Sequence, residues 1–146
     1  MTDPGFWTDR EDNLFNSRIN CYYALMKTSQ DPRHLERIKV MQELFSFAFS
    51  SEQKAENKKS QLILSRKEDI DKWIEAAAPK WDAGKINRID LAILRLAVYE
   101  LMIERKNPPK VTVDESVELA KEYGSESSPG FINGALGKLI ADNNLL

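Results

Sequence analysis

The run Arg88-IDLAILRLAVYELMIE-Arg105 decides the fold of this chain. Its apolar residues point to nearly every side of a helix, which is typical of a helix buried at the centre of a domain. Asn87 suits the cap of this helix, and Asp90 places an acid in its first turn. The polar side chains within the run, Arg95, Tyr99 and Glu100, are therefore candidates for buried, paired groups.

Downstream of this run, the sequence predicts two more helices. Asn107-Pro108-Pro109 ends the central helix, because proline lacks the amide donor that a helix needs. Thr112-x-x-Glu115 is typical of a capping box that opens a helix through Tyr123, and Gly124 suits a left-handed stop. Ser128-Pro129 predicts the cap and first turn of a last helix through about Asp142. Within it, Gly134 and Gly137 would let a neighbouring backbone approach closely.

Upstream, apolar residues at helical spacing predict three helices, over 12–28, 32–49 and roughly 60–78. Asp31-Pro32 suits the cap and first position of the second, and Pro79 ends the third. Strand patterns are almost absent. We therefore expect an all-α fold of about six or seven helices, in one domain over 1–146. Two small three-helix sub-bundles, a front one over about 12–80 and a rear one over about 87–142, would pack across each other.

The composition of the chain excludes several classes of protein. The 146 residues carry 21 Lys+Arg and 23 Asp+Glu, so the chain is not a nucleic-acid binder that works by bulk positive charge, although a local basic patch is still possible. One cysteine and one histidine allow neither an intrachain disulfide nor a zinc site of the usual kind. The first residues lack the apolar core of a signal peptide, and no apolar run is long enough to span a membrane. These features predict a cytoplasmic protein.

Catalysis has little support in the sequence. His34 is expected to be an exposed or half-buried helix residue, Cys21 a packed one, and there is no glycine-rich phosphate loop. We expect no enzyme, no cofactor and no metal. Binding has more support, because the segment 123–134 joins two helices with small residues, hydroxyls and a helix N-terminus that favours phosphate.

Three runs in order resemble the NusB family of bacterial transcription antitermination factors: INRIDLAILRLAVYEL over 86–101, PPKVTVDESVELAKEYGSE over 108–126 and SPGFINGALGKL over 128–139. The resemblance implies a non-catalytic protein that binds a boxA-type RNA together with a small-subunit ribosomal protein in the NusE role. The complex would act on the RNA polymerase elongation complex, and self-association as a homodimer is also possible.

Carried over by position, the resemblance suggests roles for single residues. The candidates for RNA binding are Arg18, Lys121, Ser128, Phe131 and Asn133, and the candidate for the protein partner is Asp90. For the first helix of the family, we prefer the stretch 18–26 over a second option, 35–45. The stretch 8–18 carries three acids against two arginines, whereas the family has a dense basic cluster just before and within its first helix. RNA binding should therefore be weaker than is usual, or be supplied by other residues such as Lys85, Arg88 or Lys121.

Two other functions compete with this interpretation. In the first, the chain is a protein-only adaptor of the same fold whose RNA binding has decayed, as the acidic N-terminal region suggests. In the second, it is part of an RNA methyltransferase, since NusB-like domains occur in front of such enzymes. A chain of 146 residues has no room for the cofactor-binding domain of that enzyme.

Overall fold

The computed structural model describes residues 31–49, 55–80 and 84–145, and these residues form helices without strands. The predicted all-α class is therefore confirmed. In chain order the elements are α2 (Pro32–Phe49), α3 (Lys58–Ser65), α4 (Lys67–Ala77), α5 (Arg88–Val98), the π-helix η2 (Tyr99–Glu104), α6 (Pro109–Tyr123) and α7 (Ser128–Asp142). The predicted helix over 12–28, with Arg18 and Cys21, lies outside the described residues. No helix in the described ranges has the length and apolar character needed to cross a membrane.

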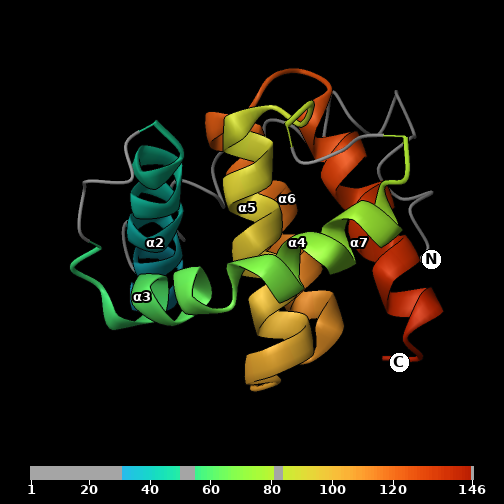
Figure 1. Ribbon diagram of the computed structural model, residues 1–146, viewed down its shortest axis with the longest axis horizontal. Coiled ribbons are helices and arrows are strands. Elements are labelled where there is room, and N and C mark those ends of the chain that lie inside the picture. Colours follow the sequence, from blue (N-terminus) through green and yellow to red (C-terminus); the bar gives the residue numbers. More distant parts are fainter. Residues whose placement is uncertain (1–30, 50–54, 81–83, 146) are drawn as a thin grey trace.

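Helix α5 is the centre of the bundle, as its sequence predicts. It packs against α2, α4, α6 and α7, and α4 crosses in front of it towards α7 (Figure 1). Every residue from Asp90 to Leu101 is buried. Burial of each large aliphatic side chain stabilises the fold by about 1.5–3 kcal/mol. The largest side chains with less than 2 % exposure come from α2, α3, α4, α5, α6 and α7: Met41, Leu44, Ile63, Ile70, Ile74, Ile93, Leu94, Leu119, Ile132 and Leu136.

Of the three polar residues predicted to be buried and paired, Arg95 and Glu100 are both, and Tyr99 is buried with 7 % exposure. Arg95 donates to both carboxylate oxygens of Asp71 on α4, over 2.9 and 3.1 Å. Glu100 accepts from Arg37 on α2 at 2.8 Å. Asn87 caps α5 by accepting from the amide of Ile89 at 2.9 Å.

Other local predictions need correction. The stretch 60–78 is not one helix, because Arg66 leaves helical geometry (φ −111°, ψ 17°) between α3 and α4. This break redirects the chain while Ile63 and Ile70 both stay fully buried. The central helix continues past Val98 as the π-helix η2. It ends at Arg105, whose left-handed φ is 53°, just before Pro108 and Pro109.

The capping box at Thr112 is also wrong, because α6 already begins at Pro109. Two successive prolines favour the first helical turn there, so Thr112 and Glu115 lie inside the helix with 1 % and 5 % exposure. Gly124 is extended (φ −89°, ψ −172°) rather than left-handed. No described atom lies within 4 Å of the Cβ positions of Gly134 and Gly137, so the close approach expected at these glycines is not found among the described residues.

Candidate functional site

The turn between α6 and α7 is built around the hydroxyl of Ser128, which is fully buried. Ser128 does not cap α7 as predicted, although the helix begins at this residue. Its hydroxyl instead accepts a hydrogen bond from the Ser125 amide at 2.9 Å and lies 3.0 Å from the Ser125 hydroxyl. A Cβ on Gly124 would lie 2.6 Å from Ser128 Cβ and Oγ, so only glycine fits here. The turn is thus closely packed, and it leaves Ser125, Glu126 and Ser127 exposed.

The other residues predicted for RNA binding around this turn differ in accessibility. Lys121 is exposed and lies 3.6 Å from Glu118 on its own helix. Phe131 is half-buried and packs against the core. Asn133 is buried with 8 % exposure. The accessible groups are therefore the turn, Lys121 and part of Phe131, whereas Ser128 and Asn133 lie beneath the surface.

Asp90, the residue predicted for the protein partner, is buried beside the start of α7 with 6 % exposure. Burial raises the pKa of its carboxyl, and a side-chain hydrogen bond from Ser128 lowers it by less. Within the part of the chain that the structure describes, its Oδ1 has no hydrogen-bond partner. The structure therefore brings Asp90 and Ser128 together inside the protein, at the junction of the α5 and α7 starts.

On another side of the α5 start, Arg88 reaches over the ring of Phe49 at the end of α2. The guanidinium carbon lies 4.3 Å from the ring centroid, and Phe45 meets the same ring edge-on, with centroids 4.7 Å apart. Arg88 is one of the basic residues that the sequence suggested as an alternative to the missing N-terminal cluster. Its aromatic partner was not predicted, since Phe49 reads in the sequence as part of the apolar stripe of its helix.

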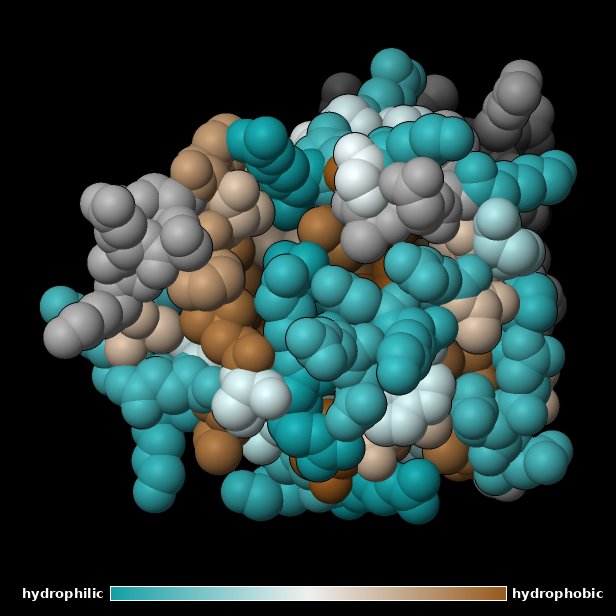
Figure 2. Space-filling model, in the orientation of Figure 1, coloured by the Kyte–Doolittle hydropathy of each residue, from teal (hydrophilic) through white to brown (hydrophobic). Residues whose placement is uncertain are grey.

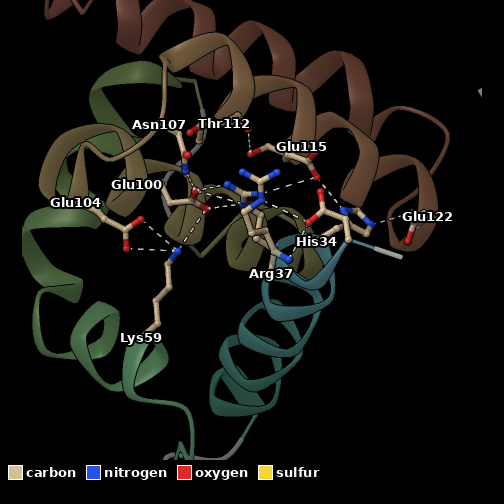
Figure 3. A network of polar contacts seen from close by, with 12 residues as sticks. His34, Arg37, Lys59, Glu100, Glu104, Asn107, Thr112, Glu115 and Glu122 are labelled. Carbon is tan, nitrogen blue, oxygen red and sulfur yellow. Dashed lines mark hydrogen bonds and ion pairs between the residues drawn. The ribbon is translucent and has the colours of Figure 1, made fainter. Parts of the chain in front are cut away.

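A buried polar network, which the sequence did not predict as a unit, joins α2 and α3 to η2 and α6 (Figure 3). The prediction for His34 is wrong, because this residue is only 1 % exposed. Its Nδ1 lies 2.8 Å from Glu115 and its Nε2 lies 3.3 Å from Glu122, both on α6. The carboxylates of α6 thus supply the hydrogen-bond partners of a histidine on α2. This pairing offsets the free-energy cost of burying either polar group without a partner.

The second half of the network centres on Glu100. Three hydrogen bonds of 2.8–3.2 Å link it to the guanidinium of Arg37. The Lys59 ammonium lies 3.8 Å from Glu100 and 3.4 Å from Glu104. The described cations of this network come from α2 and α3, and its acids come from η2 and α6. It therefore fastens the front helices to the rear ones.

Comparison with known proteins places these observations in a family. Two similar curated proteins are both named Transcription antitermination protein NusB. The one from Clostridium novyi (strain NT) is 49% identical over 78 residues, which are 53% of this chain and 59% of the relative. The one from Geobacter sulfurreducens is 43% identical over 79 residues, or 54% and 57% of the two chains. The matched stretch thus spans little more than half the length of these relatives.

Solved structures agree in fold. The structure described as "T. maritima NusB, P3121, Form 2" is 31% identical, with a TM-score of 0.67 over 77% of this chain and 92% of its own. A chain in "Crystal Structure of a Plectonemic RNA Supercoil" has a TM-score of 0.69 over 77% and 96%, and at 21% identity it supports the fold alone. The model of the NusB family matches residues 22–141, which is well over half of the sequence, so the chain belongs to the NusB family.

Proposed function

We propose that this NusB-family protein is a non-catalytic factor in transcription antitermination, which acts in the cytoplasm. It would bind a boxA-type RNA together with a small-subunit ribosomal protein in the NusE role, and so modify the RNA polymerase elongation complex. Relatives named Transcription antitermination protein NusB support this proposal.

The observation that carries the RNA half is the closely packed turn at 124–128. It presents three exposed polar residues at the start of α7, beside the exposed Lys121. Hydroxyls, backbone amides and a lysine are groups that contact phosphate, and a ring such as that of Phe131 can stack on a base. Ser128 contributes from below, because its hydroxyl holds the turn in place, and Asn133 lies buried on α7.

The test is a titration of the full chain with a boxA-type RNA oligonucleotide, with and without the ribosomal protein, at about 50 and 200 mM salt. We expect binding that weakens with salt, with a slope of roughly 0.7 for each phosphate contact on a single strand. Loss of Lys121 by Lys121→Gln should lower this slope, whereas Lys138→Gln, near the far end of α7, should leave it unchanged. Absence of RNA binding under both conditions would contradict the RNA half of the proposal.

The second candidate function is a protein-only adaptor. The burial of Ser128 and Asn133 favours it, because neither side chain is free to contact RNA directly. An adaptor would bind the ribosomal protein with an affinity that RNA does not change.

Light scattering on the samples of the RNA titration would detect a homodimer. A dimer that dissociates when RNA is added would indicate that the RNA-binding surface lies at the dimer interface.

A further inference from the structure

The ring of His34 lies between two carboxylates of α6. Its Nδ1 is 2.8 Å from a carboxylate oxygen of Glu115, and its Nε2 is 3.3 Å from one of Glu122 (Figure 3). An ionised carboxylate only accepts hydrogen bonds, so each ring nitrogen must carry a proton in order to donate one. A neutral imidazole has a proton on one nitrogen and a lone pair on the other. Both contacts are therefore hydrogen bonds only when the ring is the doubly protonated imidazolium.

The two carboxylates differ in how firmly they are held. The side chain of Glu115 is 6 % exposed and lies 4.0 Å from the guanidinium of Arg37, whereas the side chain of Glu122 is 23 % exposed. A neutral ring keeps the shorter and better buried hydrogen bond when its one proton is on Nδ1. Its Nε2 then turns a lone pair towards the oxygen of Glu122, and two lone pairs repel each other. The contact with Glu122 is thus the one that the loss of a proton breaks.

The other charged groups at this corner are held by their own partners. Arg37 donates three hydrogen bonds to Glu100 of η2. The amide of Arg33 donates to the carboxylate of Asp31 at 2.9 Å, and this bond, with one from the amide of His34, lowers the pKa of Asp31. Histidine is the side chain that ordinarily changes its charge between about pH 5 and 8. The chain has one histidine, so a change of pH near neutrality acts on this corner through His34.

Glu122 connects this ring to the α6–α7 turn. It is the last residue but one of α6, and the amide of Gly124, which follows the helix, donates to the carbonyl of Ala120 at 2.9 Å. The turn arches over the top of the molecule in Figure 1, and hydrophilic side chains lie along that edge (Figure 2). A contact that holds Glu122 therefore fixes the last turn of α6, from which the exposed residues 125–127 follow.

The charge of the ring has a second effect on the turn. The stretch 114–126 carries one lysine and five acids: Asp114, Glu115, Glu118, Glu122 and Glu126. An RNA phosphate at the turn would meet this negative charge, and the net charge of −2 of the whole chain does not offset it. A protonated His34 balances one of the acids from beneath α6, and the loss of its proton removes that balance. Both effects therefore act in the same direction.

We propose that His34 is a positioning residue for RNA binding: with both ring nitrogens protonated it holds Glu122 and sets the turn at 124–128 for RNA, and the loss of one proton releases this contact. The inference rests on the proposed function and adds its regulation by pH. The ring is only 1 % exposed, so it acts through Glu122 rather than by touching RNA. The form that holds Glu122 binds the second proton more tightly than the released form does, so a falling pH favours it. The contribution to RNA binding is complete at low pH and is lost as the pH rises.

The experiment measures the binding of a boxA-type RNA to the full chain at one salt concentration and at pH about 6.0 and about 7.5, where histidine titrates. The wild type should bind about 3- to 30-fold more tightly at the lower pH, because one proton taken up over about 1.5 pH units changes a binding constant by at most about 30-fold. His34→Gln should bind as weakly at both pH values as the wild type does at the higher one. Glu122→Gln should also bind independently of pH, because an amide can accept from the ring or donate to it and so suits both protonation states.

A matched control lies on the same helix as the ring. Glu36→Gln removes an exposed carboxylate two residues from His34 and should keep the pH dependence of the wild type. Isotope-labelled histidine reports on this ring alone, because the chain has a single histidine. The two ring nitrogens should have nearly equal chemical shifts at the lower pH, as an imidazolium does. Thermal melts at both pH values would show that each variant is folded.

The outcomes separate this inference from the proposed function. A wild type whose RNA binding does not change with pH, or a His34→Gln variant that keeps the wild-type pH dependence, would overturn the inference and leave the proposed function standing. A ring that carries a single proton at the lower pH would also overturn it. A wild-type chain that binds no RNA at either pH would refute the proposed function itself, and this inference with it.

Discussion

Arg37 of α2 and Glu100 of η2 form a buried ion pair between residues 63 positions apart in the sequence. Their side chains are only 9 % and 2 % exposed, and the shortest contact is 2.8 Å. Burial alone would lower the pKa of the guanidinium, but the hydrogen bonds and charge of Glu100, with the charge of Glu115, raise it. Arg37 thus stays charged in the folded protein, and each partner depends on the other for its hydrogen bonds.

Removing one partner of the Arg37–Glu100 pair should lower the free energy of unfolding much more than removing an exposed charge does. We expect Arg37→Ala to lower the free energy of unfolding by about 3–5 kcal/mol, because it leaves the Glu100 carboxylate buried with weaker partners. Urea unfolding followed by circular dichroism measures this loss. Arg33→Ala, on the same helix with a side chain that is 77 % exposed, is the control and should change little. Equal effects of the two substitutions would contradict the role assigned to the pair.

The contacts of His34 lead to a second expectation. Both ring nitrogens face carboxylates of α6, so His34→Leu leaves Glu115 and Glu122 without this partner. We expect a loss of about 1–3 kcal/mol in urea unfolding, the cost of an unsatisfied buried polar group. Glu36→Gln, an exposed change two residues away, serves as the control. A His34→Leu protein as stable as the wild type would show that the network does not fasten α2 to α6.

These two side chains also show how far the sequence can predict the structure. The apolar pattern of 88–105 is local information, and it correctly predicted a buried central helix with paired polar groups at Arg95 and Glu100. The partners of such groups come from distant helices, so no spacing rule could find Arg37 or His34 as members of the network. Sequence reasoning expected His34 near the surface, because a polar residue in a first helical turn is usually solvated.

The site was predictable to a similar extent. The residues themselves singled out the segment 123–134. The burial of Ser128 within it goes with the close packing of Gly124 and with Asp90, which lies 38 positions earlier in the sequence. The Arg88–Phe49 pair joins two helix ends that are 39 positions apart. Both arrangements arise from tertiary packing, which periodicity and capping rules do not describe.

Asp90 should make stability depend on pH. Its pKa is raised in the folded state, mainly by burial, so the folded protein binds this proton more readily than the unfolded chain. At a pH below the pKa of Asp90 in the unfolded chain, this carboxyl does not change the stability. As the pH rises from that pKa to the higher pKa of the folded state, the carboxyl progressively destabilises the protein. Asp90→Asn should therefore stabilise the protein at neutral pH and flatten its pH dependence above pH about 4.

Denaturant unfolding at a series of pH values measures this effect. Asp71→Asn is the matched control, because that carboxylate accepts two hydrogen bonds from Arg95 and its loss should destabilise the protein. The explanation fails if Asp90→Asn is less stable than the wild type at neutral pH. In that case the hydrogen bond from Ser128 would stabilise the charged carboxylate by more than its burial destabilises it.

Glycine substitutions should have opposite effects at two places. Gly124→Ala would put its Cβ 2.6 Å from Ser128 and 2.7 Å from the carbonyl oxygen of Ala120, which is backbone and cannot move aside cheaply. We expect a loss of about 1–3 kcal/mol and a faster amide exchange of Ser125, whose hydrogen bond to Ser128 would be displaced. Gly134→Ala, in the interior of α7 with nothing described within 4 Å, should instead stabilise the chain by up to about 1 kcal/mol. Thermal melts of both variants show whether each substitution stabilises or destabilises the protein. A destabilised Gly134→Ala would mean that another segment packs on this face of α7, as the sequence had suggested for its glycines.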